Sequence, residues 1–280
     1  MQPRIAYVTQ AVTGPPDPDR DVLLAALRRA RLQGVPVAWD ADVDWSDFDL
    51  VLIRSSEQAA RSGRQEFLRR IRHIEGQTLL ANPAVVLARN SDLTYLRDLA
   101  GRGVKTADTV WFEPGDSTDD CAETLRGKGW SRFAVRANTG HVRATVAHSP
   151  EEAARVAGEF ASRGAVGSIQ SDGEEQLVSV VLLDGHVSHA VARTEGMSGE
   201  PERVAIEAGL TEFVESMVPL AASEPLLYAR VDAVEDAGQW LLKRFDAVGP
   251  TLFLDDRTAE TLAWGVRRWL TEEVGPVPAG

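Results

Sequence analysis

Apolar runs and amphipathic segments alternate through the first part of the chain. The runs predict strands over residues 5–9, 35–39, 50–53 and 78–81, and the amphipathic segments predict helices over residues 22–33 and 65–74. In the first helix the leucines share roughly one face, and Gly34 is expected to end it. Strands and helices in alternation favour an α/β layer built on a parallel sheet.

The rest of the chain mixes β segments with single helices. Strands are predicted over residues 109–112, 133–136, 144–147, 168–170, 177–184 and 186–192, and helices over residues 93–100, 150–162, 204–217 and 258–273. Asp184-Gly185 is a strong hairpin signal between two of these strands. A second hairpin is expected where residues 227–232 and 240–246 flank the turn-type residues 235–238. The predicted class is therefore α/β followed by α+β.

Composition narrows the class of protein and of partner. The 280 residues are 44% hydrophobic and 26% charged, which indicates a folded protein with room for two or three lobes. A net charge of −12 disfavours nucleic acid and anionic membranes as partners. No apolar run reaches the about 18 residues of a membrane span, and the first residues lack a signal-peptide pattern, so a cytoplasmic location is expected. The single cysteine, Cys121, excludes an internal disulfide and a cysteine-rich zinc site.

Two carboxylates lie in the last predicted hairpin. Asp232 ends its first apolar run and Asp246 ends its second. Carboxylates on neighbouring strands can together seat a divalent metal ion. This hairpin is therefore the first candidate for a functional site.

Six short phrases keep a fixed order along the chain. They are Leu80–Pro83, Arg89–Asp92, Tyr95–Leu99, Leu183–Ala190, Tyr228–Asp232 and Pro250–Leu254. Together they resemble the ATP-grasp ligases, and most closely a glutathione-synthetase-like branch of small carboxylate–amine ligases common in actinobacteria. The resemblance implies an N-terminal α/β domain over residues 1–88 and a two-lobed ATP-grasp unit over residues 89–280. The smaller lobe is expected over about residues 108–172 and the C-terminal lobe over residues 173–280.

The resemblance implies ATP-dependent chemistry between the two lobes. In the family, the γ-phosphoryl group passes to a substrate carboxylate, and an amine then attacks the acylphosphate. This chemistry needs positive charge around the phosphates and hard oxygen ligands for magnesium. By motif position, the nucleotide contacts are Arg136, His141, Arg143 and Gln170, and the metal ligands are Asp232 and Asp246. The implied catalytic residues are Arg136, Arg230 and Arg244, and the substrate-binding residues are Arg54 and Ser55.

Several positions depart from the family pattern. Leu93 stands where a phosphate-binding lysine is usual, and Gly249 replaces a family glutamate. Arg244 stands where a metal-bridging glutamate is expected, and a guanidinium has no lone pair to give magnesium. Arg136 replaces a lysine but keeps the charge and can bind phosphate through two N–H groups. The resemblance thus implies ATP and magnesium, whereas Leu93, Arg244 and Gly249 disfavour both.

Some of these arginines keep two interpretations. The guanidinium of Arg244 either takes the place of the metal or forms a structural ion pair in a retired site. Arg136 and Arg230 either bind an anion or brace the interface between lobes. At the end of a parallel strand, Arg54 and Ser55 either contact a ligand or belong to the capping of the next helix.

Two functional hypotheses follow. The first is a ligase-like enzyme of specialised metabolism that acts on a small amino-acid-like metabolite with an altered ATP and magnesium site. The alternative is a degenerate pseudo-ligase without ATP chemistry, which serves as a binding or partner protein or catalyses an ATP-independent step. The sequence leaves open which metabolite is bound. It also leaves open the oligomeric state, for which a homodimer through the N-terminal domain is one candidate.

Overall fold

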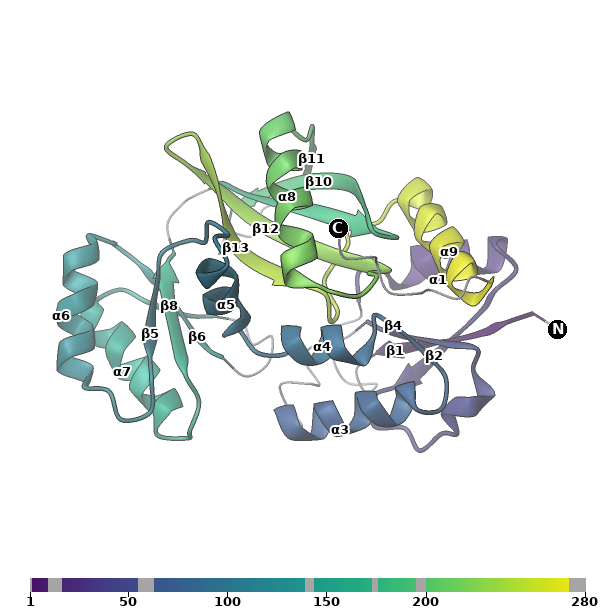
Figure 1. The fold of residues 1–280 in the computed structure, drawn as a ribbon, viewed down its shortest axis with the longest axis horizontal. Helices are drawn as coiled ribbons and strands as arrows, with labels where there is room; N and C mark the ends of the chain where they lie inside the picture. Colours follow the sequence, from purple (N-terminus) through teal and green to yellow (C-terminus); the bar gives the residue numbers. More distant parts are fainter. Residues whose placement is uncertain are drawn as a thin grey trace.

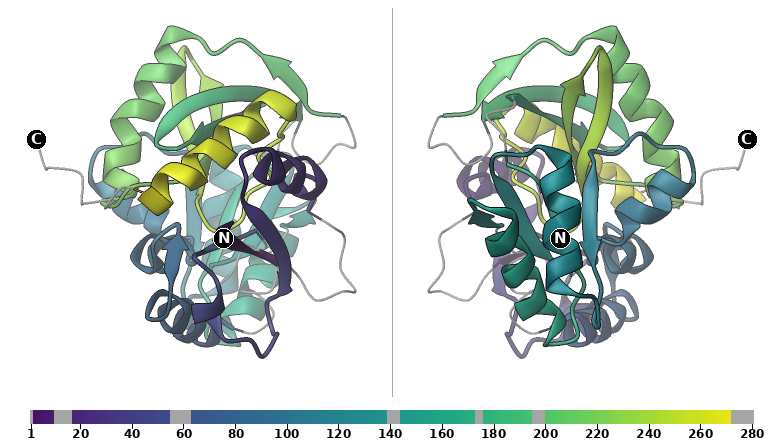
Figure 2. Two further views of the ribbon diagram at one scale, coloured as in Figure 1. Left: turned by 90° about the vertical axis from the view of Figure 1, so that its right-hand side faces the viewer. Right: turned by 90° about the vertical axis from the view of Figure 1, so that its left-hand side faces the viewer.

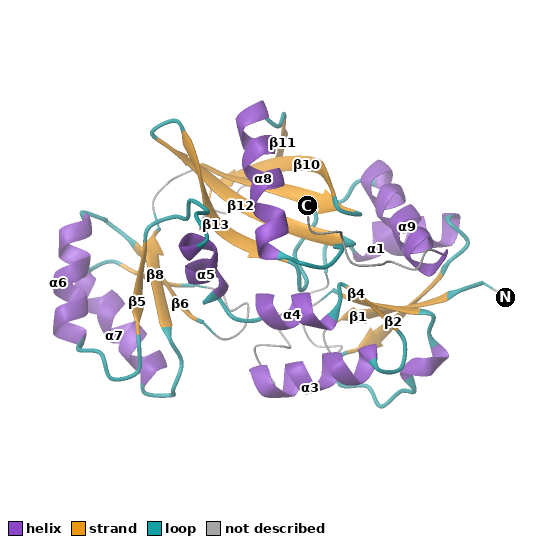
Figure 3. Cartoon of the chain, in the orientation of Figure 1, coloured by secondary structure: helices purple, strands orange, loops and turns teal. Residues whose placement is uncertain are grey.

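Three β-sheets, each with its own helices, form the protein (Figure 1). The structure is a computed structural model that describes residues 2–9, 17–54, 63–138, 144–172, 176–194 and 200–271. The strand orders are β2-β1-β3-β4, β5-β8-β6-β7 and β11-β10-β9-β12-β13. Figure 3 shows helices beside each of the three sheets. Within the described ranges, no helix combines the length and apolar character needed to cross a bilayer.

The N-terminal sheet is parallel, as predicted. Its elements are β1 (Arg4–Thr9), α1 (Arg20–Arg29), β2 (Gln33–Ala38), the 3₁₀ helix η1 (Trp45–Asp47), β3 (Leu50–Ile53), α3 (Arg64–Glu75) and β4 (Leu79–Ala81). Alternate residues of β1 enter two different cores: Ile5 and Tyr7 pack with α1, and Ala6 and Val8 pack with α3. Both faces of the sheet are therefore covered, as is usual for parallel sheets.

The first helix ends earlier than predicted. It stops at Arg29, and Arg31 follows with a φ of 58°. Gly34 lies inside β2 and does not end the helix, so that prediction is wrong. A Cβ at Gly34 would lie 2.7 Å from Cδ2 of Leu24, so the glycine allows the strand and the helix to approach closely.

The sheet of the smaller lobe is antiparallel and is covered on one face. Its elements are β5 (Thr109–Phe112), α6 (Thr118–Lys128), β6 (Phe133–Ala137), β7 (Thr145–Ala147), α7 (Pro150–Ala161) and β8 (Gly167–Ser171). Phe133, Val135 and Ile169 pack against α6 and α7. Helix α6 was not predicted, although Ser117 caps it through a hydrogen bond from the Asp120 amide, and Gly129 ends it with a φ of 68°.

The C-terminal sheet contains both predicted hairpins. The remaining elements are α4 (Ala84–Asn90), α5 (Tyr95–Gly101), β9 (Gln176–Leu183), β10 (His186–Thr194), β11 (Glu202–Val204), α8 (Ala208–Ala221), β12 (Tyr228–Asp236), β13 (Gln239–Asp246) and α9 (Asp256–Thr271). The hairpin turns place Asp184-Gly185 and Ala237-Gly238 at positive φ, as a two-residue turn of type I′ requires. The helix predicted from Val204 begins at Ala208, because residues 202–204 pair with β10 as β11.

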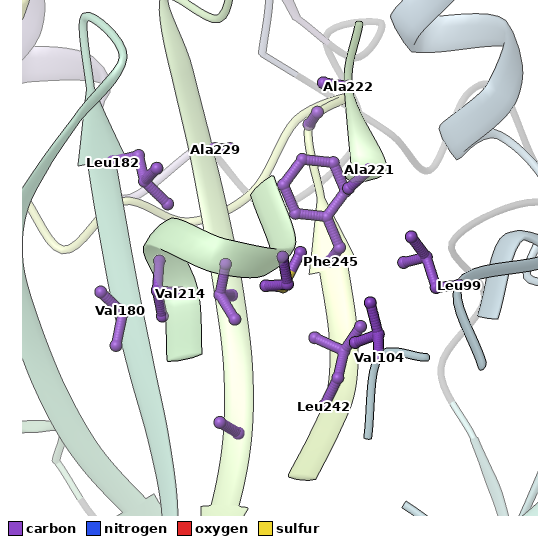
Figure 4. Close-up of a cluster of buried hydrophobic side chains, with 14 of the residues drawn as sticks. Leu99, Val104, Val180, Leu182, Val214, Ala221, Ala222, Ala229, Leu242 and Phe245 are labelled. Atoms are coloured by element: carbon purple, nitrogen blue, oxygen red, sulfur yellow. The ribbon is translucent and has the colours of Figure 1, made fainter. Parts of the chain in front are cut away.

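The two faces of this C-terminal sheet have different surroundings. One face is buried beneath α5 and α8, and Figure 4 shows Val180, Val214 and Phe245 within that core. On the other face, Val181 and Tyr228 pack with α1 and α9, which lie side by side in Figure 2. The rest of that second face is polar, and it holds the candidate site.

Candidate ligand-binding site

The polar face of the C-terminal sheet carries arginines and aspartates in opposed pairs. Because Val231 and Phe245 point into the core under α8, their neighbours along β12 and β13 point to the other face. In the antiparallel register Asp232 lies opposite Arg244, and Arg230 lies opposite Asp246. With Arg193 from β10, these four residues form what we call the arginine cluster.

Asp232 is the centre of the arginine cluster. Its Oδ1 accepts hydrogen bonds from Nε of Arg230 (2.9 Å) and Oγ of Ser179 (2.6 Å). Its Oδ2 accepts from Nη2 of Arg230 (3.1 Å) and Nη2 of Arg193 (3.1 Å). Burial alone would raise the pKa of Asp232, but the charges of Arg230 and Arg193 outweigh it and hold this pKa well below its usual range. The carboxylate therefore stays ionised, and each of its oxygens accepts two hydrogen bonds.

Asp246 connects the arginine cluster to the segment that follows β13. Its Oδ2 pairs with Nη2 of Arg244 at 3.3 Å, and its Oδ1 accepts from the amides of Val248 (3.2 Å) and Gly249 (3.4 Å). Nη1 of Arg230 donates to the carbonyl of Thr251 at 3.1 Å. The two aspartates are thus held by protein donors from several elements.

The segment from Gly249 to Asp255, which we call the strap, has little regular structure, and side chains hold its backbone. Asp19 accepts from the amides of Leu252 (2.6 Å) and Leu254 (2.9 Å). Nε2 of His189 lies 2.8 Å from the Leu252 carbonyl, which makes this nitrogen the donor. Nη2 of Arg203 donates to the Phe253 carbonyl at 2.9 Å.

Arg54, predicted to bind substrate, lies in the interior. Its side chain is 0% exposed and pairs with Asp17 (3.2 Å) and Asp19 (3.0 Å). Its Nη2 also donates to the Pro250 carbonyl of the strap at 2.9 Å. We call Asp17, Asp19 and Arg54 the closed cluster. In this arrangement Arg54 fastens the strap to the N-terminal sheet.

The smaller lobe presents the opposite surface. Since Phe133 and Ile169 face α6 and α7, Arg136 and Gln170 lie on the helix-free face of their sheet. This sheet lies between its helices and the rest of the molecule (Figure 1). Gln170 is buried and donates to Oγ1 of Thr109 at 2.9 Å. The predicted residues Ser55, His141 and Arg143 lie outside the described residues.

Comparison with known proteins identifies the architecture. Residues 5–82 match the family of the N-terminal domain of the D-cycloserine synthetase DcsG. The crystal structure of DcsG superimposes with a TM-score of 0.83 at 23% identity, over 95% of this chain and 99% of that chain. The chain has an ATP-grasp fold. The predicted resemblance and fold class are thereby confirmed.

Other ATP-grasp structures are similar over nearly the same length. The D-alanine–D-alanine ligase from Bacillus anthracis complexed with ATP gives a TM-score of 0.67 at 15% identity, over 96% of this chain and 97% of that one. A RimK domain ATP-grasp protein from Sphaerobacter thermophilus gives 0.69 at 16% identity, over 94% and 99%. No curated protein matches the sequence.

The residues at the expected ATP-grasp metal position do not fit magnesium. Magnesium requires oxygen ligands with free lone pairs in near-octahedral geometry. Across the described ranges, no group of three or more His, Cys, Asp or Glu side chains could hold a metal ion. Three guanidinium groups against two carboxylates leave the arginine cluster with a formal charge of +1, which repels a cation.

Another position that departs from the ATP-grasp pattern is filled by packing. Leu93 is 7% exposed, and its side chain belongs to the core under α5 and α8. Arg193 and Ser179 were not predicted as site residues, although they complete the environment of Asp232. Ser179 lies opposite Asp232 on β9, a pairing that no local sequence signal reveals.

Proposed function

We propose that this protein binds a small amino-acid-like metabolite within an ATP-grasp frame and does not carry out magnesium-dependent phosphoryl transfer. Support for the metabolite class comes from the fold, which the protein shares with the D-cycloserine synthetase DcsG and with D-alanine–D-alanine ligases. Support for the loss of the magnesium step comes from a single feature. Both oxygens of Asp232 already accept hydrogen bonds from Arg230, Arg193 and Ser179.

Calorimetric titration with ATP, with and without magnesium, tests this proposal. We expect no magnesium-dependent binding, and no ADP release in the presence of a panel of D- and L-amino acids. The same panel, titrated without nucleotide, should contain at least one ligand. A D-alanine–D-alanine ligase measured in parallel serves as the positive control. Micromolar binding of ATP that requires magnesium, together with ADP release, would contradict the proposal.

A second candidate is a working ligase with an altered nucleotide site. It is favoured by Arg136, which keeps a positive charge on the helix-free face of the smaller lobe. Under this candidate, Asp232 remains essential, and Asp232→Asn should abolish ATP-dependent product formation. Retained turnover in that variant would exclude a metal-binding role for Asp232.

A further inference from the structure

The arginine cluster has the charge of an anion site at the place where the fold family binds cations. Three of its five side chains are arginines, and each of its two carboxylates is paired with at least one of them. Lys243, the neighbour of Arg244 along β13, donates to the Ser171 carbonyl at 3.2 Å.

The ion pairs hold the guanidinium groups in place without enclosing them. Asp232 is 4% exposed, whereas the side chains of Arg193 and Arg244 keep 27% and 23% exposure. Arg193 uses Nε for Ser179 (3.0 Å) and Nη2 for Asp232. Among the described residues, Arg193 donates hydrogen bonds through Nε and Nη2, and its side chain as a whole is 27% exposed. A guanidinium fixed along one edge presents its other edge in a defined orientation, which suits a planar or tetrahedral oxyanion.

We propose that the arginine cluster binds an oxyanion of the ligand directly, so that guanidinium groups replace the metal ion. This inference rests on the proposed function, because it names the part of the metabolite that this face recognises. A carboxylate is the favoured group, because the proposed metabolite is amino-acid-like. A phosphate is the alternative source of the same chemistry. No bond forms or breaks in this step, and Arg193 and Arg244 act as binding residues.

Titration in the presence of EDTA tests the inference. The probes are pyrophosphate and the amino-acid panel, each followed by calorimetry and by the shift in melting temperature. We expect binding that EDTA leaves unchanged and that added magnesium does not strengthen. Arg193→Gln should lower the affinity of the probe at least tenfold. Arg193→Lys keeps the charge but lacks the paired N–H groups of a guanidinium, so its affinity should lie between those of Arg193→Gln and the unmodified protein. Selective loss of amino-acid binding identifies the carboxylate, and selective loss of pyrophosphate binding identifies the phosphate.

The matched control is Arg126→Gln on α6. It also removes one guanidinium and one ion pair, with Glu151, but lies outside the arginine cluster. Its affinities should equal those of the unmodified protein, and its melting curve shows how much a surface arginine contributes to stability. Unliganded melting temperatures of both Arg193 variants show whether the fold is intact.

The outcomes separate this inference from the proposed function. Binding that requires magnesium, or binding that survives Arg193→Gln in a folded variant, overturns the inference. If an amino acid binds the Arg193→Gln variant with unchanged affinity, the inference is overturned and the proposed function is retained. A third outcome is that no amino acid in the panel binds, whereas pyrophosphate binds in the presence of EDTA and loses this binding in Arg193→Gln. That outcome supports the anion site and overturns the proposed metabolite class.

Discussion

Two arginine–aspartate clusters contact the backbone of the strap, and they differ in charge and in exposure. In the closed cluster one guanidinium meets two carboxylates, and the side chains of Arg54, Asp17 and Asp19 are 0%, 8% and 3% exposed. In the arginine cluster three guanidinium groups meet two carboxylates, and the Arg193 side chain is 27% exposed. Arginine and aspartate thus fasten the strap to the N-terminal sheet in the closed cluster. In the arginine cluster the same residue types leave positive charge partly exposed.

The largest effect is expected in the closed cluster. Asp19→Ala removes the acceptor for the Leu252 and Leu254 amides and leaves Arg54 buried with one carboxylate fewer. Loss of one partner of a buried ion pair costs about 3–5 kcal/mol, so the free energy of unfolding should fall by that amount in urea denaturation. Asp256→Ala removes an exposed aspartate paired with Arg29 and should cost less than about 1 kcal/mol. If Asp19→Ala and Asp256→Ala lowered the free energy of unfolding by similar amounts, burial would not explain the contribution of the closed cluster.

Asp232→Asn should lower the free energy of unfolding by a smaller amount, and this loss should depend on pH. The variant keeps the shape of the side chain but loses charge-assisted bonds, which corresponds to about 2–3 kcal/mol at neutral pH. Because folding lowers the pKa of Asp232, its contribution is present above the usual aspartate pKa and is lost as the pH falls. The stability gap between variant and unmodified protein should therefore narrow on acidification. Urea denaturation midpoints at a series of pH values measure this difference in stability. A difference that widens as the pH falls would contradict a lowered pKa of Asp232 in the folded protein.

His189 should make the attachment of the strap sensitive to pH. Burial lowers the pKa of His189 from 6.5 to about 4, so the folded protein holds it neutral at pH 7. Between these values the unfolded chain binds the proton more readily, and stability should fall by about 2 kcal/mol as the pH drops from 6.5 to 4. His189→Gln should lack this component in the same pH series. An identical pH profile for both proteins would rule out His189 as its source.

The smallest effect is expected at the outer edge of the strap. Arg203 pairs with Asp255 at 3.0 Å, with side-chain exposures of 39% and 58%. Exposed pairs of this kind contribute about 0–1 kcal/mol, so Arg203→Gln should lower the unfolding free energy by no more than that. Ligand affinity should be unchanged, because Arg203 is not part of the arginine cluster. A loss comparable to that of Asp19→Ala would show that the strap is held chiefly from its outer edge.

Much of the fold follows from periodicity along the chain. The predicted strands at residues 50–53 and 109–112 agree with β3 and β5 residue for residue. Both hairpins follow from turn signals, which are Asp184-Gly185 in one and the turn-type residues 235–238 between two apolar runs in the other. Helices α4 and α6 were missed. Helix α4 has seven residues, too few to show a clear period, and the sequence signals of α6 are its caps, Ser117 and Gly129.

The site was predicted in part. The pairing of Asp232 with its neighbour strand follows from the hairpin, so the two aspartates were placed together correctly on adjacent strands. The partners of Asp232 were not predicted, because Arg193 is 39 residues away and Ser179 is 53 residues away. Arg54 was expected at a ligand-facing edge, but its partners Asp17 and Asp19 enclose it.

The sequence alone determined most of the local elements, the positions of the two hairpins and the presence of an arginine where a metal ligand is expected. Those properties depend on residues close together in the chain, where side-chain period and turn chemistry act directly. Only the tertiary structure decided which charges became neighbours. Sheet pairing brought Arg193 and Ser179 to Asp232, and docking of the strap closed one cluster while the other stayed accessible. Burial and charge balance are properties of those long-range contacts, and they separate a structural ion pair from a candidate binding site.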